Sequence, residues 1–187
     1  MKRINVIIML FIIMCMTQYQ NTYASNMYYI AHRGYCKSAP ENSLPAFKAA
    51  GRAGFTGIEC DIHETAKDKK GKRRFVIMHD QTLNRMCNVS GRSIYQKKLT
   101  YSQIRKNYYI KSGNNVSDYS KRELRIPSLE EYLSVCKKYH MIPVIEIKQN
   151  MKKDTVKRLY LCIKKAKMQN RAIITCKYKK PLSYICM

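Results

Sequence analysis

The sequence predicts an α/β protein built around a parallel sheet, and two observations carry this prediction. Short apolar runs that end in polar residues alternate along the chain with longer amphipathic segments, which is the pattern of βαβ units. The chain has 187 residues, of which 45 % are hydrophobic, and only 5 are prolines and 7 glycines. This length and composition suit one domain with a sizeable core and exclude a disordered or collagen-like chain.

Each expected element rests on a local pattern. The expected strands are 27–34, 57–65, 75–80, 141–148 and 171–178, and the expected helices are 43–54, 127–140 and 154–168. Ser43 precedes the first helix as an N-cap, and Ser128 with Glu131 forms a capping box at the start of the second. The stretch 83–126 is expected to be irregular with a weak helix near 100–107, and a further helix would begin at Pro181.

The first 24 residues have the pattern of a secretory signal peptide. A basic start is followed by 11 apolar residues, Val6 to Met16, and small residues precede a cleavage site after Ala24. An apolar run of this length is too short to span a membrane, which takes roughly 20 residues. We therefore expect residues 25–187 to form a secreted or extracytoplasmic domain, with an uncleaved N-terminal anchor as the alternative.

The charge balance favours anionic partners. Lysine and arginine total 36 against 12 acidic residues, which gives a net charge of +24. The lysines are spread over nearly every segment, so the pattern indicates solvated faces and no specific nucleic-acid site. The most basic run, residues 67–74, is interpreted either as a solvated hairpin tip or as a contact to an anionic membrane or wall polymer. The oligomeric state is left open by these patterns.

Ionisable residues stand at the ends of four successive predicted strands. They are His32 and Arg33, Glu59 and Asp61, His79 and Asp80, and Glu146 and Lys148. In a parallel α/β barrel the carboxyl ends of the strands gather on one face, which holds the active site. Taken singly, each group is typical of a loop anchor or a surface pair, but the joint pattern predicts a functional site.

Each residue type in this set has a chemical use. Glu59 and Asp61 are two apart on one strand and point the same way, and Glu146 could complete a site of oxygen ligands. Such ligands suit Ca²⁺ or Mg²⁺. His32 and His79 could exchange protons near neutral pH, and the set also contains Arg33 and Lys148, whose positive charge suits a phosphate group.

Six motifs occur in the order and spacing of one known family. They are AHRG (31–34), APENSLPAF (39–47), GIECD (57–61), HDQTLNR (79–85), IPSLEEYL (126–133) and IEIK (145–148). Together they resemble the glycerophosphodiester phosphodiesterase family over residues 28–150, and more faintly to 178. The resemblance implies a TIM-barrel fold and hydrolysis of a small glycerophosphodiester substrate to sn-glycerol 3-phosphate and an alcohol.

The resemblance also implies a role for each site residue. His32 and His79 would be the acid/base pair, and one divalent cation, Ca²⁺ or Mg²⁺, would bind the three carboxylates Glu59, Asp61 and Glu146. Arg33 would contact phosphate, with Lys148 beside it as a substrate-binding residue. The stretch 83–126 corresponds to the insertion found in this family.

The chain departs from the family in length. We count about five of the eight strands of a full barrel, so the fold is expected to be an incomplete TIM-barrel-type domain. Apolar strand residues are then expected to lie partly uncovered, namely Ile58, Ile62, Val76, Val144 and Ile145, and the monomer to be unstable with little activity. Two other functions stay open, an inactive remnant that binds phosphate-bearing polymers and an enzyme of the lysophospholipase D kind.

Overall fold

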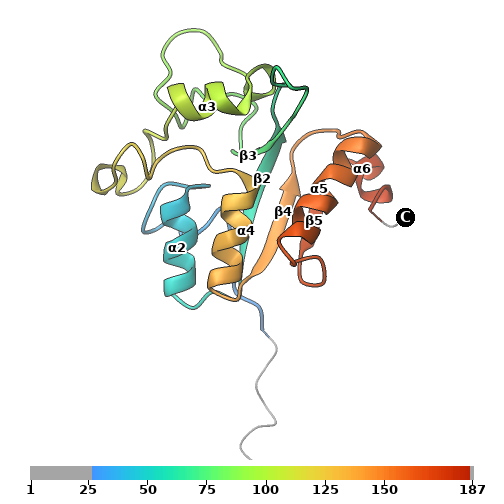
Figure 1. The fold of residues 1–187 in the computed structure, drawn as a ribbon. Coiled ribbons are helices and arrows are strands. Elements are labelled where there is room, and N and C mark those ends of the chain that lie inside the picture. The colour runs from blue at the N-terminus through green and yellow to red at the C-terminus, as the bar shows by residue number, and fades with distance from the viewer. Residues whose placement is uncertain (1–26, 186–187) are drawn as a thin grey trace, which may run out of the picture.

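The computed structural model describes residues 27–185, so the expected signal peptide over 1–24 lies outside the described residues. Within that range five strands form one sheet, with three helices packed on one of its faces (Figure 1). No helix in this range is long and apolar enough to cross a membrane. The arrangement agrees with the α/β fold that the sequence predicts.

Four of the strands run parallel and lie in the order β1-β2-β4-β5. Their bounds are Ile30–Ala31 for β1, Gly57–Glu64 for β2, Ile142–Ile147 for β4 and Ile173–Cys176 for β5. The pairing of β2 with β4 is the longest and includes Asp61 opposite Glu146. Because the strands are parallel, their carboxyl ends lie along the same side of the sheet, which is its carboxyl edge.

The third strand, β3 (Phe75–Ile77), corrects one prediction, because it runs antiparallel to β2. The connection between these strands is a tight polar turn, in which Asp68 accepts hydrogen bonds from the backbone N–H groups of Lys70 and Lys72. A parallel neighbour needs a crossover of a dozen or more residues, which this turn does not provide. Strand β2 continues beyond the carboxyl end of β4, so the turn lies outside the sheet. Strand β3 then runs back beside β2 toward the sheet.

Helices α2 and α4 begin directly after their capping serines, and α5 begins one residue before its expected start. They span Leu44–Arg52, Leu129–Lys138 and Lys153–Lys165, and a short α6 follows β5 at Lys179–Ser183. Ser43 caps α2 through a bond from the Ala46 N–H. The capping box of Ser128 and Glu131 is confirmed, since both of its hydrogen bonds are present.

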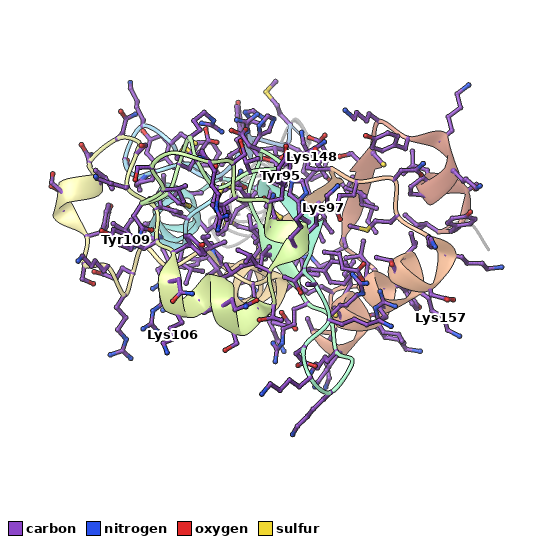
Figure 2. All side chains as sticks on the ribbon, turned by 90° about the horizontal axis from the view of Figure 1, so that it is seen from above. Tyr95, Lys97, Lys106, Tyr109, Lys148 and Lys157 are labelled. Atoms are coloured by element: carbon purple, nitrogen blue, oxygen red, sulfur yellow. The ribbon has the colours of Figure 1, made fainter. Side chains whose placement is uncertain are left out.

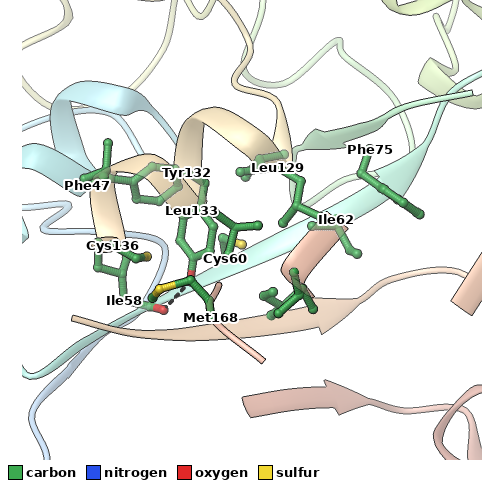
Figure 3. Close-up of a cluster of buried hydrophobic side chains, with 14 of the residues drawn as sticks. Phe47, Ile58, Cys60, Ile62, Phe75, Leu129, Tyr132, Leu133, Cys136 and Met168 are labelled. Atoms are coloured by element: carbon green, nitrogen blue, oxygen red, sulfur yellow. Dashed lines mark hydrogen bonds between the residues drawn. The ribbon is translucent and has the colours of Figure 1, made fainter. Parts of the chain in front are cut away.

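The main core lies between the sheet and the helices (Figure 3). Alternate residues of β2, namely Ile58, Cys60 and Ile62, are fully buried against α2 and α4. Tyr132 of α4 reaches into this layer, and its hydroxyl donates a 2.6 Å hydrogen bond to the carbonyl of Ile58. This contact ties α4 to the strand that carries two of the candidate site residues.

The stretch 83–126 forms a second, smaller core above the carboxyl end of β2 (Figure 1). Helix α3, Tyr101–Asn107, agrees with the weak helix expected there, and two 3-10 turns, Gln96–Lys98 and Val116–Asp118, complete its regular structure. Ile104 and Ile110 are buried with Val76 and Met78. The segment therefore packs onto β3 and supports the residues that follow this strand.

The expectation of uncovered strand residues is wrong for the five residues named. Ile58, Ile62, Val76 and Ile145 are fully buried and Val144 is 9 % exposed. Ile58, Ile62 and Ile145 face the helices, whereas Val76 and Val144 lie on the opposite face, where the second core covers Val76. The uncovered apolar groups on that face are Ile30 and Ile173, with 37 % and 48 % exposure.

Candidate active site

Three carboxylates meet on the sheet face that points away from the helices. Along β2, Glu59 and Asp61 alternate with the core residues, so both side chains project from this face. Glu146 of β4 pairs in register with Asp61 and projects beside it. One oxygen from each of the three carboxylates lies within 4.8 Å of the others.

Two oxygen atoms of this cluster are buried without a hydrogen-bond partner among the described residues. They are Glu59 Oε1 and Asp61 Oδ1. Burial, and next the charge of Asp61, raise the pKa of Glu59 to about 7. Buried carboxylates in contact are costly unless a cation compensates them. Three converging oxygen donors with two unsatisfied atoms thus fit a hard divalent cation such as Ca²⁺ or Mg²⁺.

The raised pKa of Glu59 gives a testable pH dependence of stability in a chelating buffer. The folded state holds a proton on Glu59 between its ordinary pKa of 4.5 and about 7, whereas the unfolded state has lost it. The Glu59 contribution to the free energy of unfolding is therefore lost as pH rises through this window, by on the order of 3 kcal/mol.

Urea unfolding of the wild type and Glu59→Gln at several pH values measures this contribution as the difference between the two. Glutamine does not titrate, so the difference should change between pH 4.5 and 7. Glu130→Gln, a change of a surface carboxylate on α4, should leave the wild-type pH dependence unaltered. Parallel curves for wild type and Glu59→Gln would show that Glu59 does not titrate in this range.

Two cationic side chains border the carboxylates. Lys148 Nζ lies 2.9 Å from Glu146 Oε1 and 3.4 Å from Asp61 Oδ1, and Arg33 Nε lies 3.4 Å from Asp61 Oδ2. Burial by itself would lower the pKa of Lys148, but these carboxylates outweigh it and raise the pKa. The ammonium is therefore charged beside the cluster at neutral pH, where it can attract a phosphate.

The turn after β1 positions Arg33 by its backbone conformation. Arg33 has a φ of 58° and its backbone N–H donates a 2.9 Å hydrogen bond to Glu59 Oε2. Gly34 follows with a φ of 87°, and a Cβ there would lie 2.7 Å from the Cβ of Ala46. Only glycine allows this turn to pack so closely on α2.

The two predicted histidines lie at the same edge. His32 is exposed, with its Nε2 atom 3.9 Å from Glu59 Oε2. His79 comes two residues after β3, and its Nδ1 atom lies 2.7 Å from Asp80 Oδ1. A carboxylate only accepts hydrogen bonds, so Nδ1 donates and Nε2 is left to exchange a proton. The antiparallel β3 thus still brings His79 to the carboxyl edge.

An ionic chain connects His79 with Arg33. Asp80 accepts a 2.7 Å hydrogen bond from Arg85 Nε, and Arg85 Nη2 lies 2.6 Å from Glu41, which also contacts Arg33 Nη1 at 3.3 Å. The Arg85 hydrogen bonds lower the pKa of Asp80 to about 2, so Asp80 is ionised when it holds His79. This series of ionic contacts orients both the candidate proton donor His79 and the candidate phosphate-binding residue Arg33.

The structure also shows supporting residues to which the sequence analysis assigned no role. Asn42 Nδ2 donates a 2.7 Å hydrogen bond to Asp61 Oδ2 and so fixes this carboxylate. His63 follows Asp61 on the same face, its Nε2 atom lies 3.3 Å from the carbonyl of His79, and burial lowers its pKa to about 4. Two of the quoted motifs contained signals for these residues. The Pro-Glu-Asn stretch includes Glu41 and Asn42, and the stretch from Asp80 ends at Arg85.

A cleft of about 650 Å³ opens next to this cluster. Lys148 and His63 line it, together with Lys97 from the 83–126 segment; Figure 2 shows Lys97 and Lys148 near the middle of the molecule. All seven predicted site residues lie at the carboxyl ends of the strands, and one of them, Lys148, also lines the cleft. The fold and this cluster define an α/β-barrel-type protein with a candidate metal-dependent centre that has two histidines and two cationic groups.

The chain belongs to the glycerophosphoryl diester phosphodiesterase family, whose model matches residues 32–186. Human glycerophosphodiester phosphodiesterase 1 is 33 % identical over 134 residues, which is 71 % of this chain and 38 % of the human protein. A glycerophosphodiester phosphodiesterase of Caldanaerobacter subterraneus is 33 % identical over 148 residues, which is 78 % of this chain and 56 % of that protein. The chain thus spans roughly two fifths to just over half of these relatives.

Solved structures show the same fold. A glycerophosphodiester phosphodiesterase from Agrobacterium tumefaciens has a TM-score of 0.67 at 23 % identity, over 85 % of this chain and 61 % of that chain. An Oleispira antarctica phosphodiesterase in complex with the product sn-glycerol-3-phosphate has a TM-score of 0.69 at 23 % identity, over 84 % and 60 %. The described residues form part of a TIM-barrel-type α/β fold.

Proposed function

We propose that this protein hydrolyses glycerophosphodiesters to sn-glycerol 3-phosphate and an alcohol, with one Ca²⁺ or Mg²⁺ ion held by Glu59, Asp61 and Glu146. The observation that carries the proposal is the cluster of three carboxylates, two of which have a buried oxygen that accepts no hydrogen bond among the described residues. Family membership and the sn-glycerol-3-phosphate complex of the Oleispira protein support the choice of substrate. The signal-like residues 1–24 support a location outside the cytoplasm.

In this proposal the substrate phosphate lies beside the carboxylate cluster. Arg33 and Lys148 contact its oxygens, because both cations already border Asp61. The alcohol group extends into the cleft lined by His63, Lys97 and Gln149. A bound divalent cation would neutralise phosphate charge and lower the pKa of the adjacent glycerol hydroxyl.

The two histidines carry the protons in two successive steps. One histidine takes the proton of the glycerol hydroxyl as its oxygen forms a bond to phosphorus, while the other protonates the alcohol oxygen as its bond to phosphorus breaks. The resulting cyclic phosphate is opened by water with the two roles reversed, which returns both histidines to their starting state. Asp80 holds His79 in orientation through both steps.

A substrate panel tests this function. The little activity expected from the sequence rested on uncovered strand residues, and these residues are buried. We therefore expect the chain with Ca²⁺ or Mg²⁺ to release sn-glycerol 3-phosphate from glycerophosphocholine and glycerophosphoethanolamine, measured with glycerol-3-phosphate dehydrogenase. Lysophosphatidylcholine, in which an acyl chain esterifies one of the two free glycerol hydroxyls, is the matched comparison, with choline release as its readout. Preferred release of choline from the lysolipid would instead indicate an enzyme of the lysophospholipase D kind. Binding of poly(glycerol phosphate) without turnover of either substrate would indicate a non-catalytic remnant.

A further inference from the structure

A second cavity lies outside the candidate active site, on the outer side of the molecule. This basic groove has a volume of about 880 Å³ and runs between the β2–β3 turn, α4 and α5. Its base contains Phe75 and Leu133, and Leu161 of α5 lines it with half of its side chain exposed. The carboxylates and histidines of the candidate site do not line it, so the groove needs its own explanation.

The rim of the groove is strongly cationic. All five lysines of the groove lining lack an ion pair among the described residues, namely Lys67, Lys72, Lys137, Lys165 and Lys167. Glu130 is the one acidic residue in the described lining, and Arg74 already pairs with it at 3.4 Å. Like charges gathered at one groove repel each other, so this rim favours an anionic partner.

We propose that the basic groove docks on a membrane surface rich in anionic phospholipid. Lysines over a surface of this kind each add to the attraction, and an exposed apolar side chain between them can enter the headgroup region. Leu161 provides such a group, and Tyr160 beside it on α5 is 45 % exposed. A polyanionic wall polymer would satisfy the lysines but would leave Leu161 without an apolar partner, so the groove favours the membrane.

The position of the groove connects this surface to the cleft beside the candidate site. Arg73 and Arg158 line both cavities and pair with Glu64, which lines the cleft. Docking through the groove would therefore hold the cleft near the membrane. This docking does not depend on turnover of a substrate, and it can be measured as binding alone.

The first test compares two sets of charge reversals in the full chain. Lys137→Glu, Lys165→Glu and Lys167→Glu alter the groove, whereas Lys106→Glu, Lys111→Glu and Arg122→Glu alter the segment that carries α3. Figure 2 shows Lys106 on α3 and Lys157 on α5 at opposite sides of the molecule. Both sets change the net charge equally, and the N-terminal segment is common to both, so its contribution cancels.

Partition is measured by sedimentation with phosphatidylcholine vesicles, with and without phosphatidylglycerol, at physiological salt. The groove variant should bind the anionic vesicles about 100-fold more weakly than the wild type. In the control variant, the decrease in the logarithm of the partition coefficient should be less than about a third of the decrease in the groove variant. Equal losses in the two variants would mean non-specific attraction by net charge and would overturn the proposal. Unchanged vesicle binding in both variants would overturn the proposal as well.

A tryptophan probe reports on the groove directly, because the chain contains no tryptophan. In Leu161→Trp we expect a blue shift of emission with anionic vesicles and quenching by brominated lipid. Ile173→Trp, equally exposed but on the opposite face of the sheet, should show neither. Emission at 161 that responds to poly(glycerol phosphate) and not to vesicles would overturn the membrane proposal in favour of a wall polymer, and emission that responds to neither would also refute it.

Discussion

Replacing His79 by asparagine is expected to lower turnover of glycerophosphocholine by about 10²–10⁴-fold. His79 is held by Asp80 at 2.7 Å, which leaves its Nε2 atom to exchange a proton. Asparagine keeps a polar side chain at this position but cannot act as acid or base near neutral pH. Steady-state release of sn-glycerol 3-phosphate gives the size of the loss, and calorimetry should show unchanged Ca²⁺ affinity.

Two further histidine variants complete this experiment. His32→Asn should cause a loss of the same order, because both proton transfers are needed for turnover. His140→Asn is the matched control, since His140 is exposed after α4 and asparagine tolerates its positive φ of 56°. If His79→Asn retained near wild-type turnover, His79 would be a structural residue and its assignment as an acid/base group would be lost.

Replacing Glu59 by glutamine is expected to weaken the binding of Ca²⁺ or Mg²⁺ by more than about 100-fold. The change removes a charge from the cluster of three carboxylates while it keeps the shape of the side chain. Asp61 and Glu146 cannot compensate, because Lys148 already lies within 3.4 Å of both. Isothermal titration calorimetry measures the change, and circular dichroism checks that the variant is folded.

Glu130→Gln serves as the control for metal binding, because Glu130 is a surface residue of α4 that pairs with Arg74. Its affinity for the divalent cation should equal that of the wild type. Equal affinity in the Glu59 and Glu130 variants would place the cation elsewhere in the protein. The carboxylate cluster would then need another explanation for its two buried oxygens that accept no hydrogen bond.

Local sequence signals predicted the helices well, because the information lies in neighbouring residues. Ser43 and the Ser128–Glu131 capping box mark helix starts through hydrogen bonds that span only three residues. The direction of β3 was predicted wrongly, since the short apolar run from Phe75 to Met78 does not specify its partner strand. The burial of strand residues was also misjudged, because alternation along β2 assigns Ile58 and Ile62 to the helix side.

The shared location of the candidate site residues was predictable because strand ends and motif order together place them at one edge, and their roles stay predictions. Their supporting contacts were harder to predict, since they join residues far apart in the chain. Asn42 and Asp61 are 19 residues apart, and Arg85 and Glu41 are 44 residues apart. Such contacts depend on how the turn after β1 and the segment after β3 pack together, which no local pattern encodes.

The most direct test of the proposed function follows phosphorus resonances of glycerophosphocholine in the presence of the protein. With Ca²⁺ or Mg²⁺ present, the phosphodiester signal should be replaced by the phosphomonoester signal of sn-glycerol 3-phosphate. A chelator should stop the conversion, renewed addition of the cation should restore it, and Glu59→Gln should not convert the substrate in either condition. Conversion that continues in the chelator, or no conversion by the wild type with either cation, would contradict a metal-dependent phosphodiesterase centre at this edge of the sheet.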